Sequence, residues 1–307
     1  MAMYHSIGEL IGDTPLLEIT KFQLPEGVRL YAKLEFYNPG SSVKDRLGVE
    51  LINDALEKGK VKPGGTIIEP TAGNTGIGLA LAAMEKDLSV IFCVPEHFSI
   101  EKQQLMQALG AKIIHTPKED GMVGAIDKTK QLVDEIPNSY SPQQFSNPAN
   151  PATYYKTLAP ELWKDLNGEI DVFIAGAGSS GTFMGTSRFL KEKNNHLRAV
   201  IVEPEGSIIA GGDPGPHKTE GIGMEFFPGF FDRNLIDGIC TVSDKDAFEM
   251  VKQLAEKEGL LVGSSSGSVM YAALQEAQKA KKGTKIITVF PDGSDRYLSK
   301  GIYPIEN

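Results

Sequence analysis

Short apolar runs alternate with segments of helical periodicity along most of the chain. Buried strands are predicted from the apolar runs at 66–70, 88–95, 111–117, 171–175, 198–204 and 285–290. Helices are predicted where apolar residues recur on one helical face, at 99–110, 124–136, 182–194 and 243–259. Strands that alternate with helices of this length are typical of parallel sheets covered on both faces, so the pattern predicts an α/β fold.

The alternating pattern falls into two series. A polar stretch around 137–151 separates them, which predicts two α/β domains with a cleft between them. One connection, at 211–229, is too long and too rich in Gly and Pro for a routine link. Loops of this kind are usually functional or mobile.

Composition and charge exclude several classes of protein. Lys and Arg number 31 against 40 Asp and Glu, a net charge of −9, and no basic run offers a surface for nucleic acid. No apolar run reaches the roughly 18 residues of a membrane span, and no secretory signal is visible. Cys93 and Cys240 lie in apolar runs, which predicts buried, reduced thiols. We therefore expect a cytoplasmic protein without a metal site.

The motif GAGSSG, Gly176–Gly181, allows two interpretations. It follows a predicted strand, opens a predicted helix and has Glu203 at the end of the next strand, as in the dinucleotide fingerprint of NAD-dependent dehydrogenases. Backbone amides at a helix N-terminus bind any phosphate, however, and Ser179, Ser180 and Thr182 add hydroxyl donors. Because a loop so rich in hydroxyls suits a terminal phosphate better than a bridging pyrophosphate, we predict a phosphomonoester site.

The segment NPGSSVKDRLG, 38–48, predicts a turn followed by a helix whose first turn contains Lys44. A cation at that position opposes the helix dipole, which disfavours the ammonium form. A lysine whose neutral form is favoured is what Schiff-base chemistry requires. Taken alone, a solvated surface lysine remains the simpler interpretation.

Two further loops are rich in small residues and open predicted helices. In PTAGNTGIG, 70–78, the side chains of Thr71, Asn74 and Thr75 are placed to bind a carboxylate or a ring hydroxyl. The run GSSSGS, 263–268, is by itself more typical of a plain helix cap.

Taken together, these loops resemble those of one family. Seven motifs occur in the family's order: IGDTPLL, NPGSSVKDRLG, TAGNTG, QQFSNPANP, GAGSSGTFMG, EGIGMEFFP and GSSSG. The family is that of the pyridoxal-phosphate enzymes that include O-acetylserine sulfhydrylase (cysteine synthase) and cystathionine β-synthase. The resemblance covers essentially the whole chain. It implies fold type II, similar to tryptophan synthase β, with a smaller, mobile α/β domain at 41–149 and a larger one at 1–40 plus 150–307, each in three layers.

The resemblance also implies a role for each matching residue. Lys44 would bind pyridoxal 5′-phosphate as a Schiff base and then act as the base at the substrate's Cα. Asn74 would hydrogen-bond the ring hydroxyl, and Ser265 would face the pyridine nitrogen, where a hydroxyl makes the ring a weaker electron sink than an aspartate would. The cofactor phosphate would be held by Gly178, Ser179, Ser180, Gly181 and Thr182. The amino-acid substrate would be bound by Thr71, Ala72, Gly73, Thr75, Gln144, Glu220 and Gly221.

Some positions depart from the usual family pattern. Ala72 stands where a hydroxyl residue is common, and Ser180 and Met184 alter the phosphate loop. Tyr154 stands where cysteine synthases typically have His. The segment EGIGMEFFP, 220–228, is closer to cystathionine β-synthases than to cysteine synthases.

The implied reaction is β-replacement through an aminoacrylate intermediate. O-acetyl-L-serine or L-serine loses its β-group, and a thiol then adds. Homocysteine, which gives cystathionine, is favoured because Glu220 and Glu225 would meet the amino group of a second amino acid. Sulfide, which gives cysteine, remains open, as do both activities together. A homodimer is expected, and a complex with serine acetyltransferase is compatible with the resemblance.

Two interpretations from other classes remain. An NAD-dependent dehydrogenase would hold its nucleotide at the glycine loop and would be colourless, whereas a lysine-bound pyridoxal cofactor is yellow. A non-catalytic partner of serine acetyltransferase would have no need for Lys44, Asn74 and Ser265, so the presence of all three argues against it.

Overall fold

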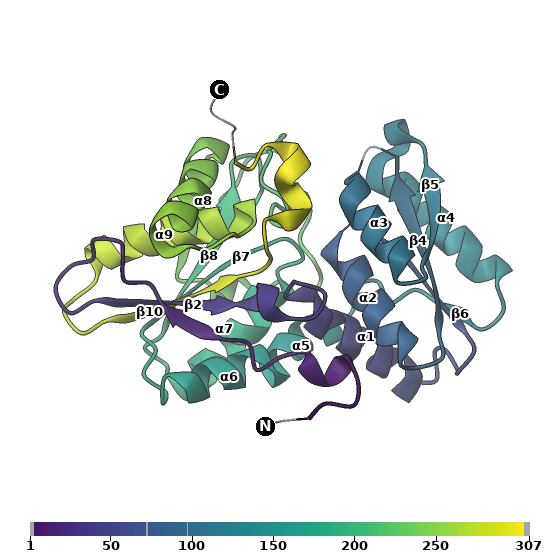
Figure 1. Cartoon of the computed structure of the whole chain (residues 1–307), viewed down its shortest axis with the longest axis horizontal. Helices are drawn as coiled ribbons and strands as arrows, with labels where there is room; N and C mark the ends of the chain where they lie inside the picture. Colours follow the sequence, from purple (N-terminus) through teal and green to yellow (C-terminus); the bar gives the residue numbers. More distant parts are fainter. Residues whose placement is uncertain (1–2, 72, 97, 304–307) are drawn as a thin grey trace. The chain divides into compact units, whose positions relative to one another are not determined.

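The structure is a computed structural model and describes residues 3–71, 73–96 and 98–303. The chain divides into two compact units (Figure 1). The smaller unit comprises Met1–Gly12 and Asn38–Asn150, and the larger unit comprises Asp13–Tyr37 and Pro151–Asn307.

Residues 3–12 and 38–40 belong to the smaller unit, although the sequence-based division assigns 1–40 to the larger domain. Hydrogen bonds from the N-terminal segment to residues far along the chain explain the difference. The Gly8 N–H donates to Glu85 Oε1 at 2.8 Å, and the Gly12 N–H donates to Asn38 Oδ1 at 2.9 Å. Local sequence gives no sign of partners so far along the chain.

The smaller unit is built on a parallel sheet of order β5-β4-β3-β6. Its strands are β3 (Thr66–Pro70), β4 (Ser89–Pro95), β5 (Lys112–Thr116) and β6 (Ser139–Tyr140). Its helices are α1 (Lys44–Glu57), α2 (Asn74–Met84), α3 (Ile100–Ala108) and α4 (Gly121–Glu135). Helix α4 covers one face of the sheet and α2 and α3 cover the other, which makes three layers (Figure 1).

The larger unit is built on a sheet of order β1-β2-β10-β7-β8-β9, in which β1 runs antiparallel to β2 and the other pairs are parallel. Its strands are β1 (Leu16–Glu18), β2 (Arg29–Leu34), β7 (Val172–Gly176), β8 (Arg198–Pro204), β9 (Gly238–Val242) and β10 (Lys285–Phe290). Its helices are α5 (Ala149–Lys156), α6 (Leu158–Asp165), α7 (Gly181–Lys193), α8 (Asp244–Glu258) and α9 (Ser264–Lys279). The first two residues of α5 still belong to the smaller unit, because the larger unit resumes at Pro151. Helix α9, with α8 beside it, covers one face, and α7, with α6 beside it, covers the other (Figure 1).

The predicted α/β architecture with mostly parallel sheets is confirmed. The apolar runs form the strands, and the polar signals at helix ends act as expected. Ser99 caps α3 by accepting the Lys102 N–H, and Ser243 caps α8 by accepting the Asp246 N–H. Each sheet therefore presents its loops at the carboxyl ends of parallel strands, where α/β proteins carry their sites.

The prediction of buried thiols is confirmed for Cys93 but not for Cys240, which is half-buried on the edge strand β9. Both cysteines are free thiols. Burial raises the pKa of both thiols, which keeps them protonated and unreactive. Among the described residues, no helix combines the length and apolarity that crossing a bilayer requires.

Candidate active site

Lys44 is the first residue of α1, as predicted. The preceding turn places Ser41 at a φ of +56°, and the Lys44 N–H donates to Ser42 Oγ at 3.2 Å. The buried Asp45 carboxylate accepts the Gly40 N–H and closes the turn. The backbone on both sides of Lys44 is thus fixed by the turn, while its side chain is only half-buried.

The start of α1 is held against α2 by a glycine contact. A Cβ on Gly78 of α2 would lie 2.3 Å from the carbonyl oxygen of Lys44, and a Cβ on Gly48 of α1 would lie 2.2 Å from the Gly78 carbonyl. Such distances exclude any side chain at either position. The two helices therefore touch backbone to backbone, and the contact fixes Lys44 relative to the helix that Asn74 begins.

The loop between β3 and α2, together with the first turn of α2, carries predicted substrate residues. Thr71 and Thr75 are buried, and the Thr75 hydroxyl donates to Gln144 Oε1 at 2.8 Å. The Gly73 N–H makes a long contact of 3.4 Å to Thr71 Oγ1. The smaller unit thus brings Thr75 together with Gln144, 69 residues apart in the sequence. Ala72, also predicted for this loop, lies outside the described residues.

Glu69, at the end of β3, was not predicted as a site residue. It is 1% exposed, and its carboxylate accepts hydrogen bonds from the Ser141 hydroxyl and from the N–H groups of Gln143 and Gln144. Burial raises its pKa, and the two backbone hydrogen bonds and the Ser141 hydroxyl oppose that shift. The available signal was a charged residue inside the apolar run TIIEP, since an acid in a buried strand needs donors to satisfy it.

The predicted phosphate loop begins α7 in the larger unit. Ser180 has a φ of +62° and precedes Gly181, the first residue of α7. Ser179, Ser180 and Thr182 are all buried, and Ser180 Oγ has no hydrogen-bond partner. A buried hydroxyl without a partner is costly unless a ligand meets it. A terminal phosphate fits this position, because it would accept hydrogen bonds from that hydroxyl and from backbone N–H groups at the helix start.

Three other predicted residues of the larger unit lie beside this loop. A Cβ on Gly178 would be 2.5 Å from the Gly221 carbonyl oxygen, and a Cβ on Gly221 would be 3.9 Å from Ser265 Oγ. The Glu220 N–H donates to the Ser264 hydroxyl at 3.0 Å, and Ser265 is buried at the start of α9. The larger unit therefore assembles the phosphate loop, the 220–221 segment and Ser265 in one place.

The two acids predicted to select the thiol differ in their surroundings. The Glu220 carboxylate lies 3.8 Å from Lys300 Nζ, with side-chain exposures of 31% and 47%. Glu225 is exposed. A substrate ammonium group that binds Glu220 would therefore replace or share the contact with Lys300.

Glu203, the acid of the possible dinucleotide fingerprint, is fully buried. Its carboxylate accepts the N–H groups of Ile209 and Ala210, at 2.8 and 2.9 Å, and the Thr241 hydroxyl at 3.1 Å. Because these internal donors occupy the carboxylate, it offers nothing to a ribose hydroxyl. The dehydrogenase alternative thus loses the acid on which it depended.

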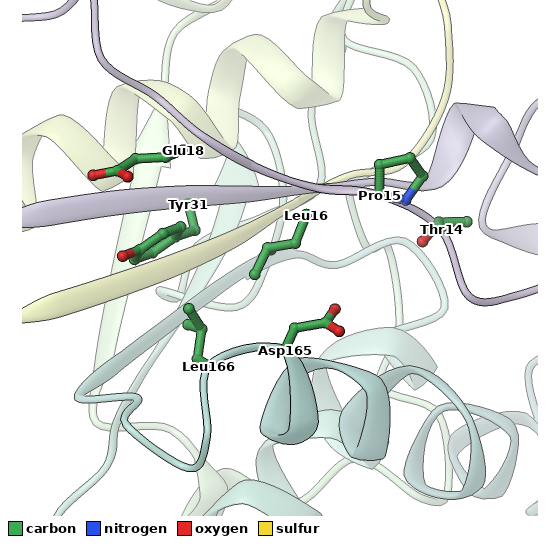
Figure 2. A pocket seen from close by; sticks show the side chains of 7 residues that line it. All are labelled: Thr14, Pro15, Leu16, Glu18, Tyr31, Asp165 and Leu166. Atoms are coloured by element: carbon green, nitrogen blue, oxygen red, sulfur yellow. The ribbon is translucent and has the colours of Figure 1, made fainter.

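A cavity of about 510 Å³ in the larger unit is a different feature (Figure 2). It is lined by Thr14, Pro15, Leu16, Glu18, Tyr31, Asp165 and Leu166. Its acids already pair with cations, Glu18 with Arg29 and Asp165 with Lys33. In the part of the chain that the structure describes, no group of three or more His, Cys, Asp or Glu residues is arranged to hold a metal ion.

Comparison with known proteins identifies the family. The family model described as "Pyridoxal-phosphate dependent enzyme" matches residues 7–292. The chain is 65% identical over 303 residues to an O-acetylserine dependent cystathionine beta-synthase of Bacillus subtilis, covering 99% of both chains. It is 54% identical over 305 residues to a cysteine synthase of Helicobacter pylori, covering 99% of this chain and 100% of the relative.

The fold leads to the same relatives. The crystal structure of O-acetylserine dependent cystathionine beta-synthase from Helicobacter pylori matches with a TM-score of 0.95 and 54% identity. The match covers 99% of this chain and 100% of that one.

The chain belongs to the pyridoxal-phosphate dependent enzymes. Its cofactor is pyridoxal 5′-phosphate, as predicted, and the buried unpartnered hydroxyl of Ser180 fits the cofactor's phosphate. Within this family, the chain is a member of the group formed by cysteine synthases and cystathionine β-synthases, which confirms the resemblance seen in the motifs.

Proposed function

We propose that this chain catalyses β-replacement on O-acetyl-L-serine, with homocysteine as the incoming thiol and cystathionine as the product. The observation that carries the proposal is the identity of 65%, over nearly the full length of both chains, to an O-acetylserine dependent cystathionine beta-synthase. Cysteine synthesis from sulfide is the second candidate, supported by the 54% identity to a cysteine synthase. L-Serine is the alternative first substrate.

The smaller unit carries the groups that bind and deprotonate the first substrate. Bound pyridoxal phosphate supplies the electron sink that makes the amino acid's Cα proton acidic. Lys44 Nζ removes that proton, and acetate leaves with the electron pair of the Cβ–O bond. The thiol loses its S–H proton to solvent, and its sulfur forms the new Cβ–S bond. Lys44 then returns the proton to Cα. Thr71, Gly73, Thr75 and Gln144 would hold the substrate carboxylate, while Asn74 would hydrogen-bond the ring hydroxyl of the cofactor.

The larger unit carries the groups that anchor the cofactor. The loop from Gly178 to Thr182 binds the phosphate with backbone N–H groups and hydroxyls. Ser265 would face the pyridine nitrogen and leave the ring a moderate electron sink, which would favour loss of the β-substituent over transamination. The close approach of Gly178, Gly221 and Ser265 supports a single binding surface for these contacts.

Thiol selection is tested by replacing the loop acids. We expect the double variant Glu220→Gln, Glu225→Gly to lose homocysteine use relative to sulfide by roughly fivefold. That factor corresponds to about 1 kcal/mol for a carboxylate–ammonium contact that is a third exposed and therefore screened by water. Steady-state rates with each thiol, at saturating O-acetylserine, measure the ratio.

The control for this experiment is Lys300→Met, which removes the Lys300 ammonium group from beside the Glu220 carboxylate. It should keep or improve the use of homocysteine. An unchanged ratio of the two thiols in the double variant would mean that the acids are solvated and play no part in selection. Equal loss with both thiols would instead indicate a general role of the loop.

A homodimer is a further part of the proposal. The smaller unit exposes large apolar side chains on its N-terminal segment, at Met3, Tyr4, Ile7 and Leu10, and at Met84 of α2. Apolar side chains gathered in this way suit burial against a second copy of the chain. A complex with serine acetyltransferase stays a prediction of the resemblance.

A further inference from the structure

We propose that Glu69 is a positioning residue that sets the affinity for the substrate carboxylate by holding Gln144. The inference rests on the proposed function, because it takes Gln144 and Thr75 as substrate contacts. It adds a residue that touches no reacting atom and acts through the loop Ser141–Gln144. All the contacts that carry it lie within the smaller unit.

The carboxylate of Glu69 binds this loop at three points. Oε1 accepts the Gln144 N–H at 2.9 Å. Oε2 accepts the Gln143 N–H at 3.0 Å and the Ser141 hydroxyl at 2.9 Å. Because Glu69 is 1% exposed, water does not compete for these hydrogen bonds, and the loop is fixed to the end of β3.

The same strand continues directly into the other half of the carboxylate site. Glu69 lies two residues before Thr71 and six before Thr75, whose hydroxyl donates to Gln144 Oε1 at 2.8 Å. Glu69 holds the Gln144 backbone, and Thr75 holds the Gln144 side chain. The Glu69 carboxylate therefore sets the distance between the Thr71–Thr75 segment and the loop that carries Gln144.

The loop needs such an anchor because its backbone is strained. Gln143 has a φ of +55°, in the left-handed region that residues other than glycine rarely adopt. A residue stays in that region only when its surroundings compensate for the cost. The hydrogen bond from the Gln143 N–H to Glu69 is such a compensation.

A carboxylate is required here, and an amide of the same shape cannot replace it. Each carboxylate oxygen of Glu69 accepts a hydrogen bond from a backbone N–H group. A backbone N–H cannot reorient or become an acceptor, as a hydroxyl can. A glutamine has one oxygen and one NH₂ group, so either orientation sets the NH₂ against a backbone N–H. Glu69→Gln therefore leaves one buried donor unsatisfied while it changes the volume hardly at all.

The experiment measures the KM for O-acetylserine in Glu69→Gln, Gln144→Ala and the double variant. We expect Glu69→Gln to raise KM on the order of tenfold, with a smaller change in kcat, because one buried donor is left unpaired. Once the Gln144 side chain is absent, adding Glu69→Gln should raise KM little further. Hydrogen exchange of the Gln143 and Gln144 amides should accelerate in Glu69→Gln, a readout that is independent of turnover.

Glu203→Gln provides the matched control. Glu203 is equally buried and likewise accepts two backbone N–H groups and one hydroxyl, but it lies in the larger unit. Glu203→Gln should lower the unfolding temperature about as much as Glu69→Gln does, and it should leave the KM for O-acetylserine unchanged. If Glu69→Gln does not fold, Ser141→Ala decides, since it removes the hydroxyl alone and should raise KM by about two- to threefold.

The outcomes separate this inference from the function on which it rests. An unchanged KM in Gln144→Ala would contradict the proposed substrate contact itself. A raised KM in Gln144→Ala beside an unchanged KM in Glu69→Gln would overturn the positioning role alone. Effects of the two substitutions that multiply in the double variant would also overturn it, because they would act independently.

Discussion

Replacing Lys44 with Ala should lower turnover of O-acetylserine by at least about a thousandfold and leave the fold intact. The variant loses the amine that we propose binds the cofactor and acts as the base at Cα, and base catalysis alone contributes about 10²–10⁴-fold. Lys44 is half-buried at the first position of α1, where alanine is a good helix former. Steady-state kinetics and thermal unfolding check both halves of the expectation, with an unfolding midpoint within about 2 °C of the parent.

Lys58→Ala is the matched control for this variant. Lys58 lies just beyond the other end of α1 and pairs with Asp54 at 2.6 Å on the surface. Its removal should leave turnover unchanged. Near-normal β-replacement in Lys44→Ala would show that another group binds the cofactor and moves the proton.

The second large effect is expected from Gly78→Ala. The added methyl would lie 2.3 Å from the Lys44 carbonyl oxygen, and backbone atoms on both sides cannot rotate away. Helices α1 and α2 must then separate, which should destabilise the smaller unit by about 3 kcal/mol and displace Lys44. Thermal unfolding should show a midpoint lower by several degrees, and turnover should fall further than the loss of folded protein explains.

Gly229→Ala controls for the loss of a glycine as such. A Cβ on Gly229 meets no heavy atom within 4 Å, and its φ lies outside the left-handed region. It should therefore behave as the parent. A Gly78→Ala protein with the parent's stability and rate would contradict the backbone contact between α1 and α2.

The central strands could be predicted because apolar, mostly β-branched residues dominate their sequences. The runs TIIEP, RAVIVEP and KIITVF form β3, β8 and β10 with the predicted bounds. Strands of this kind are buried on both faces, so composition alone marks them. Helix N-termini could also be predicted where a side chain caps the helix, as at Ser99 and Ser243.

Strand β2 was missed because its sequence, RLYAKL, contains a lysine. Lys33 is 1% exposed, and its Nζ binds the Thr14 carbonyl at 2.7 Å and the carboxylates of Glu161 and Asp165 at 3.0 Å. Those partners lie up to 132 residues away. A buried charge is acceptable only in the presence of such partners, and no local pattern reveals them.

The site shows the same division between local and distant information. The loops around Lys44, Asn74 and the phosphate site could be recognised, because glycines and hydroxyls stand together in the sequence. Glu69, which we propose positions Gln144, could not be recognised, because it lies 75 residues before the N–H group whose hydrogen bond it accepts. Motifs therefore predicted the groups proposed to touch ligands, whereas the residue proposed to position them required the fold.

The most direct test of this account is product analysis with the purified enzyme. The enzyme is given O-acetylserine together with equal concentrations of homocysteine and sulfide, and cystathionine and cysteine are quantified over the initial, linear phase. We expect cystathionine as the main product. Cysteine as the sole product, with homocysteine left unconsumed, would contradict it.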